Sequence, residues 1–525
     1  MVPAPVCSAC APGLSRAGDD AFISCVTILK VENLKEYPSR TEFALLLLVT
    51  FLAIAIHGYH PGVEDAEIYL PGIKKALNPQ LYPQNAQFFA SHAHLTLFPN
   101  LIAASVRLTH LPLEWAVLLW HVFSIFLLLL GAWHVGRLTF RGLIPRWGGI
   151  ALLASLLTIP VAGTALYIMD EYLTTRSFST PAVLFIIINV AERKFIRAGV
   201  WTLFTALIHP LMIVFGLAYA CLLVLLDRCQ PLTLEDRKTA AMTAAVLLPF
   251  GFFPPVTDVY RQVLNSRPYF FLLRWQWYEW VGIFAPLLLL CWFRAIARRQ
   301  RLTVLERMCT ALVVFGLAFF LISLALTIPA RFLNFVELQP MRALHLIYIL
   351  FFIFLGAIIA EHVLKAHVWR WLVLFAPLCA GMAFAQRQIF PASPHLEFPA
   401  TASRNDWVEA FLWVRHNTPR EAYFALDPGF MALSREDQHG FRAIAERSRL
   451  ADAVKDSGAV TMFPALAPTW QEQVQALRGW QQFRASDFQK LRQQFGVDWI
   501  VVQRPGPAGL ACPYQNPSVA VCRLE

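Results

Sequence analysis

The sequence has little charge for its length. Only 15% of its 525 residues are Asp, Glu, Lys or Arg, whereas soluble domains carry about 25%. Hydrophobic residues make up 57% of the chain, and its mean hydropathy is +0.52. This composition excludes a soluble globular protein and predicts a polytopic membrane protein. The net charge of +10 does not point to nucleic acid, because most basic residues before the C-terminal region fall in short loops between apolar runs.

Clustered cysteines are also lacking. Four of the ten fall within apolar runs, where this side chain usually packs: Cys221, Cys291, Cys309 and Cys379. Cys7 and Cys10 form a CxxC pair without a second pair of ligands nearby, which is weak evidence for a metal. Cys512 and Cys522 fall outside the cytoplasm in the topology below, where a disulfide could persist. A cleavable signal peptide is not expected, because residues 1–42 are polar and mixed.

Apolar runs alternate with short loops from residue 43 to about 390. A span needs about 20 apolar residues, and fewer where helices are short or shielded. We predict an all-α membrane domain at 43–390, preceded by a cytoplasmic tail at 1–42. Eleven transmembrane helices are predicted, at 43–57, 113–136, 147–163, 179–192, 197–208, 211–227, 239–254, 280–297, 308–328, 343–362 and 369–386.

The distribution of basic residues orients these spans. With the N-terminus inside, the inner segments hold twenty Lys and Arg and the outer loops hold nine. Counting 95–109 as a span would turn the basic hairpin Arg137–Arg146 outward, so this segment is predicted to be an interfacial helix. The same count requires a turn at His209-Pro210, because proline disrupts the helical turn that precedes it.

The region 391–525 differs in composition from the rest. Residues 405–415 have helical periodicity and are followed by NTPREAYFALDP, which reads as a loop and a short strand. Near the end, VDWIVVQR and SVAVCRLE read as strands. With eleven spans before it, this region lies outside. We therefore predict a small extracytoplasmic α/β domain at the C-terminus.

The first outer loop, 58–112, carries the adjacent acids Glu64 and Asp65. They are candidates for a catalytic site, but acids are also favoured at helix N-termini, and these two could simply cap a helix starting at Ala66. The next outer loop carries Asp170 and Glu171, which could equally be a solvated pair.

Other outer loops add cations and aromatic residues. Arg176, Arg331 and Arg342 could grip a phosphate, since guanidinium groups bind such anions bidentately, or could be interface anchors. His209 could belong to the same site or could only satisfy backbone groups freed by Pro210. A third set could stack on a sugar or could form an interfacial belt: Trp275, Trp277 and Tyr278.

The order of these parts resembles the GT-C superfamily of polyprenyl-phosphate-dependent membrane glycosyltransferases, as a divergent bacterial branch. The resemblance rests on Glu64-Asp65 followed by AEIYLPGIKKALNPQLYP, the interfacial segment 95–109, and Asp170-Glu171. It covers nearly the whole chain, but its motifs are short. The chain lacks a WWDYG-like motif and matches neither aminoarabinose nor mannosyl transferase signatures, which leaves the acceptor open.

The resemblance implies an enzyme of the bacterial inner membrane. A sugar on a polyprenyl phosphate would enter from the membrane, its phosphate held by Arg331 or Arg342. Asp65 or Glu64 would take the proton from a lipid or glycan acceptor hydroxyl, giving inversion by direct displacement. No cofactor is required, although Mg²⁺ or Mn²⁺ would fit if Asp65, Asp170 and Glu171 converge, because hard cations bind carboxylate oxygens.

Two other functions remain open. A lipid-linked substrate transporter or flippase would need charged residues within its spans and inverted repeats, and neither stands out. A non-catalytic assembly protein with the same fold would need no particular chemistry at these positions.

Overall fold

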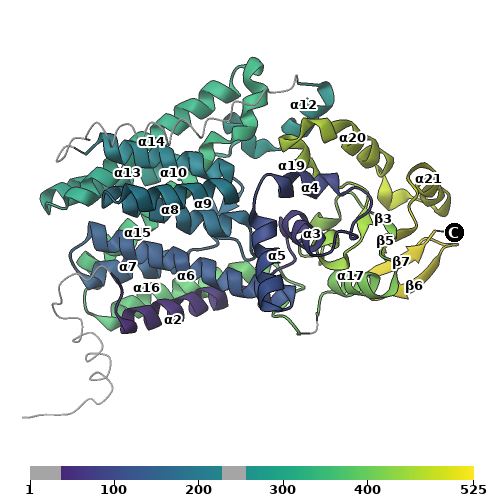
Figure 1. The fold of residues 1–525 in the computed structure, drawn as a ribbon, viewed down its shortest axis with the longest axis horizontal. Coiled ribbons are helices and arrows are strands. Elements are labelled where there is room, and N and C mark those ends of the chain that lie inside the picture. Colours follow the sequence, from purple (N-terminus) through teal and green to yellow (C-terminus); the bar gives the residue numbers. More distant parts are fainter. Residues whose placement is uncertain (1–36, 228–255, 402, 525) are drawn as a thin grey trace, which may run out of the picture.

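The computed structural model describes residues 37–227, 256–401 and 403–524, except the side chains of Ala330 and Arg331 (Figure 1). The predicted span 239–254 and the cysteines of the N-terminal CxxC pair lie outside these ranges. The described chain is mostly helical. Its membrane helices lie side by side in one half of the molecule, and a smaller unit containing the sheet forms the other half.

Six helices of the described residues are long and apolar enough to cross a membrane. They are α2 (Arg40–His57), α6 (Leu113–Thr139), α13 (Trp277–Arg299), α14 (Thr303–Thr327), the run Phe332–Leu364 that contains α15 (Ala343–Ile359), and α16 (Val368–Ile389). Three apolar helices are shorter: α8 (Thr175–Ala191), α9 (Phe195–Ile208) and α10 (Pro210–Leu225). A membrane-embedded protein is thus supported, whereas the count of eleven spans is not confirmed.

The predicted span 147–163 differs most from the structure. Its helix, α7, covers Leu143–Ser155 and is followed by the short hairpin of β1 (Pro160–Val161) and β2 (Leu166–Tyr167). Proline cannot donate a backbone hydrogen bond, so Pro160 does not continue a helix although the residues around it are apolar. The predicted turn at His209-Pro210 is confirmed, because α9 ends at Ile208 and α10 begins at Pro210.

Glycines let α7 cross α15 closely. A Cβ atom on Gly148 would lie 2.5 Å from the carbonyl oxygen of Gly356, and one on Gly356 would lie 2.3 Å from the carbonyl oxygen of Gly148. Small residues at such crossings allow helix backbones to approach and gain dispersion contacts. This pair therefore holds α7 against the central helix α15, whose residues are nearly all buried.

The segment 58–112 folds into three short helices at one end of the membrane helices, between them and the C-terminal unit (Figure 1). They are α3 (Ala66–Leu77), α4 (Gln87–His94) and α5 (Phe98–Thr109). The 12 residues of α5 cover about 18 Å, which is too short to span a bilayer. Phe98 and Ile102 of α5 are buried, while Leu108 is 81% exposed. The interfacial placement of this segment stays a prediction.

The C-terminal unit is a five-stranded mixed sheet with the order β4-β3-β5-β7-β6. The parallel strands are β3 (Tyr423–Leu426), β4 (Ser448–Arg449) and β5 (Trp499–Gln503); β6 (Ala511–Gln515) and β7 (Val519–Arg523) are antiparallel. Successive side chains alternate between two hydrophobic cores, so helices cover both faces. α17 (Asp406–Asn417) and α18 (Phe441–Ala445) contribute to one core, and α21 (Ala485–Phe495) contributes to the other. The unit also contains α19 (Lys455–Met462) and α20 (Ala467–Ala476).

The secondary structure predicted for this unit is largely confirmed. The helix expected at 405–415 is α17, and the three expected strands are β3, β5 and β7. The short strand β4 and the edge strand β6 were missed. A disulfide joins Cys512 of β6 to Cys522 of β7, with an S–S distance of 2.04 Å.

Backbone pairing docks the C-terminal unit onto the loop before α3. The Glu64 N–H donates to the Gln438 carbonyl at 2.8 Å, and the Gly440 N–H donates to the Gly62 carbonyl at 2.8 Å. Val63 also forms a β-bridge with His439. The acidic pair of the first loop is thereby placed against residues 438–440, which are far away in the sequence.

Candidate functional site

The acidic pair precedes α3 as expected, but it does not cap this helix. Asp65 occupies the N-cap position, and its side chain makes no capping hydrogen bond. Its Oδ1 atom instead accepts from Lys455 Nζ at 3.0 Å, and the same ammonium also donates to Glu64. Lys455 is the first residue of α19, so the C-terminal unit supplies the partner of both acids.

Arg176 joins the two predicted acidic motifs. One guanidinium nitrogen donates to both carboxylate oxygens of Asp170, at 3.0 and 2.9 Å, and lies 3.6 Å from Asp65 Oδ2. The hydroxyl of Thr174 also donates to Asp170, at 3.1 Å. The structure therefore brings Asp65, Asp170 and Arg176 together, at the start of α8.

Glu171 does not join this ion pair. It is 3% exposed, and its backbone carbonyl accepts from the His60 N–H at 3.0 Å. Burial raises the pKa of Glu171 to about 8, with the negative charges of Asp170 and Glu64 adding to the effect. At neutral pH Glu171 is therefore mostly protonated.

Asp65 is held in its ionised form. Its burial opposes ionisation, but the charges of Lys455, Arg176 and Arg342 outweigh this and lower its pKa far below the ordinary range. The side chains of Glu64 and Asp65 are 34% and 32% exposed, whereas that of Asp170 is only 5% exposed. Glu64 and Asp65 are thus the acids of this cluster that a substrate could reach.

The predicted metal-ligand set does not fit a metal ion. The oxygens of Asp65 and Asp170 bind the side chains of Lys455 and Arg176, and Glu171 is mostly protonated. Within residues 37–227, 256–401 and 403–524, no group of three or more His, Cys, Asp or Glu is arranged to hold a metal ion. Side-chain ammonium and guanidinium groups thus bind the carboxylates that were predicted to bind a metal.

Arg342 lies in the short 3₁₀ turn before α15 (Pro340–Arg342). Its Nε atom is buried without a hydrogen-bond partner, and its side chain makes no ion pair with a described residue. Its charge nevertheless acts on Asp65, as the lowered pKa of that carboxylate shows. A buried N–H donor without a partner has unmet hydrogen-bonding capacity, so this position is suited to an anion that is not part of the chain.

Neutral histidines surround the two arginines. Burial lowers the pKa of His92 to about 4 and that of His209 well below its ordinary value, and Arg176 and Arg342 contribute to both shifts. The His209 side chain makes no hydrogen bond within the described structure, so it does not satisfy backbone groups near Pro210. Neutral imidazoles retain one N–H donor each, which suits a polar ligand beside the arginines.

The predicted aromatic residues have other surroundings than a sugar site requires. Trp275 is buried, with its ring against Gly163 and its Nε1 donating to the Tyr269 carbonyl at 3.2 Å, so it packs the core. Trp277 and Tyr278 are 76% and 58% exposed on the first turn of α13, as in an interfacial belt. The side chain of Arg331 lies outside the described structure.

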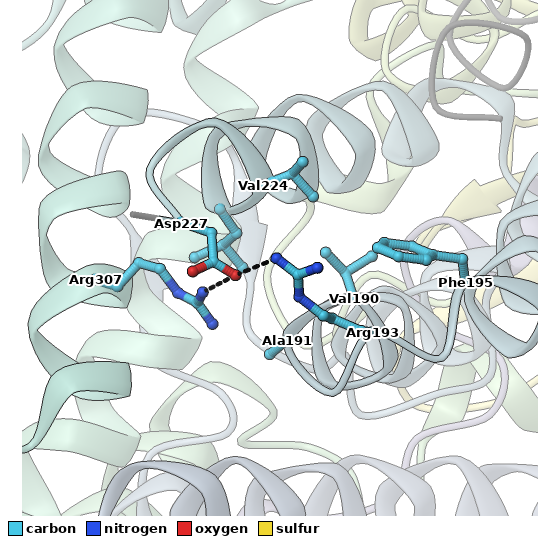
Figure 2. A pocket seen from close by; sticks show the side chains of 8 residues that line it. Val190, Ala191, Arg193, Phe195, Val224, Asp227 and Arg307 are labelled. Atoms are coloured by element: carbon cyan, nitrogen blue, oxygen red, sulfur yellow. Dashed lines mark hydrogen bonds and ion pairs between the residues drawn. The ribbon is translucent and has the colours of Figure 1, made fainter. Parts of the chain in front are cut away.

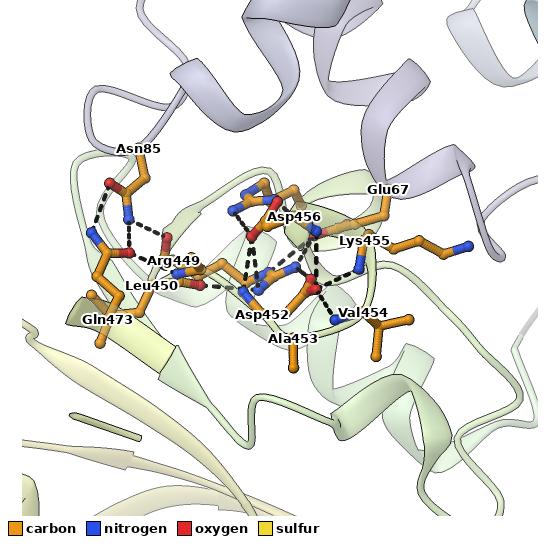
Figure 3. Close-up of polar contacts among 12 residues, drawn as sticks. Glu67, Asn85, Arg449, Leu450, Asp452, Ala453, Val454, Lys455, Asp456 and Gln473 are labelled. Carbon is orange, nitrogen blue, oxygen red and sulfur yellow. Dashed lines mark hydrogen bonds and ion pairs between the residues drawn. The ribbon is translucent and has the colours of Figure 1, made fainter. Parts of the chain in front are cut away.

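The structure contains a second ion cluster between α3 and the C-terminal unit, which the sequence analysis did not predict. Glu67 of α3 is completely buried; its Oε1 accepts from Arg449 at 2.8 and 3.0 Å, and its Oε2 accepts from the Ala443 N–H at 3.1 Å (Figure 3). Arg442 and Asp456 form two parallel hydrogen bonds of 2.8 Å. Asp452 completes the group by binding Arg449. We call these five residues the closed cluster: Glu67, Arg442, Arg449, Asp452 and Asp456.

A signal for this cluster exists in the sequence. The run FRAIAERSRLADAVKDSG at 441–458 alternates charges with small apolar residues, which is unusual for a solvated surface. Glu67 likewise follows the acidic pair on the apolar helix AEIYL. Neither pattern says which acid meets which arginine, because the partners lie in distant parts of the chain.

A histidine–carboxylate group ties the linker before α17 to the same loop. Glu397 accepts from His60 Nδ1 at 2.7 Å and from His439 Nε2 at 3.3 Å. Although burial works against both charges, the pairing raises the pKa of His439 to about 9 and lowers that of Glu397 to about 2. This group is a charged contact between the membrane helices and the C-terminal unit.

A small pocket lies at the other end of α8, away from the acidic pair. Asp227 accepts from Arg193 at 3.1 Å and from Arg307 at 2.7 Å, which links the ends of α8, α10 and α14 (Figure 2). The remaining lining residues are apolar: Val190, Ala191, Phe195, Leu223 and Val224. Because the charged groups of this pocket bind one another, we interpret it as a structural contact that holds the helices together.

Comparison with known proteins does not identify a family for this chain. No family model matches the chain, and no curated protein matches its sequence.

Proposed function

We propose that the protein is a membrane glycosyltransferase that moves a sugar from a polyprenyl phosphate to an extracytoplasmic acceptor. Arg342 carries this proposal, because its buried Nε has no hydrogen-bond partner and its charge acts on the partly exposed carboxylate of Asp65. An anion beside a proton acceptor is what transfer from a sugar phosphate requires. Arg176 and the neutral His92 and His209 supply further charge and donors around the same anion.

In the proposed reaction, the acceptor oxygen forms a bond to the anomeric carbon of the sugar, and the bond from that carbon to the phosphate oxygen breaks. The electron pair leaves with the phosphate, whose charge Arg342 and Arg176 stabilise. The acceptor proton passes to Asp65. Positive charge developing on the sugar makes the attacking hydroxyl more acidic, so a carboxylate of low pKa can serve as the base.

The orientation is part of the proposal. The twenty-to-nine distribution of basic residues supports a cytoplasmic N-terminus and an extracytoplasmic acidic pair. The Cys512–Cys522 disulfide supports an oxidising compartment for the C-terminal unit. Both agree with a bacterial inner-membrane protein whose C-terminal unit faces the periplasm.

The test is transfer by the purified protein in lipid bilayers, with a panel of polyprenyl-phosphate sugars and mixed lipid and glycan acceptors. Asp65→Asn should reduce transfer by at least about a hundredfold. Asp258→Asn is the matched control, because the Asp258 side chain is 88% exposed on α12 (Asp258–Asn265), and it should leave transfer unchanged.

Two results would contradict the proposal. Transfer that is equal in wild type and Asp65→Asn would remove the base. Binding of a polyprenyl phosphate that depends on Arg342, without transfer to any acceptor, would favour the flippase, which needs the same anion contact but no base.

A further inference from the structure

Lys455 reaches the acidic pair from the C-terminal unit. Its Nζ donates to Asp65 and to Glu64, and its side chain is only 11% exposed. An ammonium group has three N–H donors, so one remains for another acceptor. Lys455 is therefore a largely buried cation that is held in place by the two solvent-accessible acids.

The closed cluster fixes the position of the first turn of α19 and hence of Lys455. Asp452 and Asp456 accept backbone and side-chain hydrogen bonds around the first turn of α19, and Arg449 links this turn to Glu67 of α3. In Figure 3 the Lys455 side chain extends away from this group. The cation is thus delivered to Asp65 only while the C-terminal unit is docked on α3.

We propose that Lys455 is the resident counter-ion of Glu64 and Asp65 and takes the place of a divalent cation, making the site metal-independent. Lys455 is a positioning residue: it orients the two carboxylates, and its remaining N–H points charge toward whatever anion binds there. The catalytic consequence rests on the proposed glycosyl transfer. The exclusion of a metal ion from the acidic pair does not depend on glycosyl transfer. Each of the two proposals can therefore fail without the other.

A lysine counter-ion and a divalent metal ion make different demands on the carboxylates of Glu64 and Asp65. A divalent ion needs carboxylate oxygens free of other cations, and Mg²⁺ or Mn²⁺ is commonly held by one or two carboxylates with water. Replacing the ammonium with an apolar side chain of similar length would leave two adjacent carboxylates facing solvent. Such a pair attracts a divalent ion.

The experiment measures Mn²⁺ binding by electron paramagnetic resonance to the full-length protein in bilayers. Four proteins are compared: wild type, Lys455→Met, Lys455→Arg and the double variant Lys455→Met/Asp65→Asn. Lys74→Met is the matched control, because Lys74 is also a buried lysine at this interface but binds Glu446 at 2.8 Å. Thermal unfolding of each variant verifies that it is folded.

We expect wild type, Lys455→Arg and Lys74→Met to show no Mn²⁺ binding that depends on Asp65. Lys455→Met should gain a site at least about tenfold tighter than any wild-type binding, and the double variant should lose it. A purely structural role for Lys455 would change the unfolding temperature without creating this site.

The proposal is overturned if wild type binds Mn²⁺ in an Asp65-dependent way, or if folded Lys455→Met gains no site. Where transfer is detected, chelator should leave wild-type activity unchanged, and loss of activity with chelator would also overturn it. The expected Mn²⁺ pattern without transfer from any donor would leave this inference standing and remove the proposed function.

Discussion

The two ion clusters between α3 and the C-terminal unit share residue types but differ in completeness. In the closed cluster, Glu67 and Arg449 are almost fully buried and the charged groups are bound to one another. In the cluster around Asp65, two acids are about a third exposed and Arg342 has no ionic partner among the described residues. A satisfied network rigidifies a fold, whereas an unbalanced one is available to a ligand. Completeness, rather than charge, distinguishes the closed cluster from the candidate site around Asp65.

The largest effect is expected from breaking the closed cluster. Arg449→Met would leave Glu67 and Asp452 buried without their main cation, which typically costs about 3–5 kcal/mol. The free energy of unfolding of the C-terminal unit, measured by denaturant titration in detergent, should fall by this amount. A loss below about 1 kcal/mol would mean that the cluster is not the structural tie described above.

An arginine-to-methionine substitution in the cluster around Asp65 should act on binding instead of folding. Arg342→Met removes a cation that no described residue neutralises, so stability should stay constant or rise slightly. Affinity for a polyprenyl phosphate should fall by about ten- to hundredfold, because a hydrogen bond to a charged group contributes about 1.5–3 kcal/mol. Thermophoretic titration with the lipid measures this. Reduced stability with unchanged affinity would reverse the roles of the two clusters.

Glu171 provides a pH test of the same region. Its pKa is about 8 in the folded protein and near 4.5 in the unfolded chain, so the folded state retains a proton that the unfolded state releases between these values. Stability contributed by this group therefore falls as pH rises from about 4.5 to 8 and then levels off. Glu171→Gln should unfold at a higher temperature than wild type at pH 8.5 and at nearly the same temperature at pH 4.5. Parallel pH profiles would show that Glu171 is ionised in the folded state.

A smaller pH effect is expected at the contact of His439 with Glu397. The pKa of His439 is raised to about 9 from 6.5, so its stabilising charge is fully present below pH 6.5 and is lost as pH rises through 9. The pKa of Glu397 is lowered to about 2 from 4.5, so its contribution is lost as pH falls from 4.5 toward 2. Hydrogen exchange of 436–440 should be slowest between pH 4.5 and 6.5 after correction for intrinsic rates. His439→Gln should flatten the upper limb of this profile.

The smallest effect should come from an exposed ion pair of the same unit. Lys490 and Asp487 lie 2.9 Å apart on α21, and the lysine side chain is 72% exposed. Such pairs contribute little, because solvent and salt screen them. Lys490→Met should change the free energy of unfolding by less than about 0.5 kcal/mol. A loss comparable to that of Arg449→Met would mean that burial does not separate the clusters.

The sequence by itself determined the class of the protein and the position of its first acids. Low charge and long apolar runs predict membrane helices, because buried backbone in lipid must be satisfied within the helix. The turn at His209-Pro210, the short helix α5 and the strands β3, β5 and β7 follow from local rules for proline and periodicity. Asp65, Asp170 and Arg176 were also recognisable as polar groups between apolar runs.

Tertiary structure alone decided how these acids are paired. Lys455 lies 390 positions after Asp65, and Arg449 lies 382 positions after Glu67. Hydropathy and periodicity describe neighbours along the chain, so they cannot state that α19 delivers an ammonium to the loop before α3. For the same reason the sequence could not show that Trp275 packs against Gly163, or that Glu171 is buried and protonated while Asp170 binds Arg176. Contacts of this kind arise only when segments that are distant in the sequence pack together, because packing removes water from groups that were solvated in the separate segments.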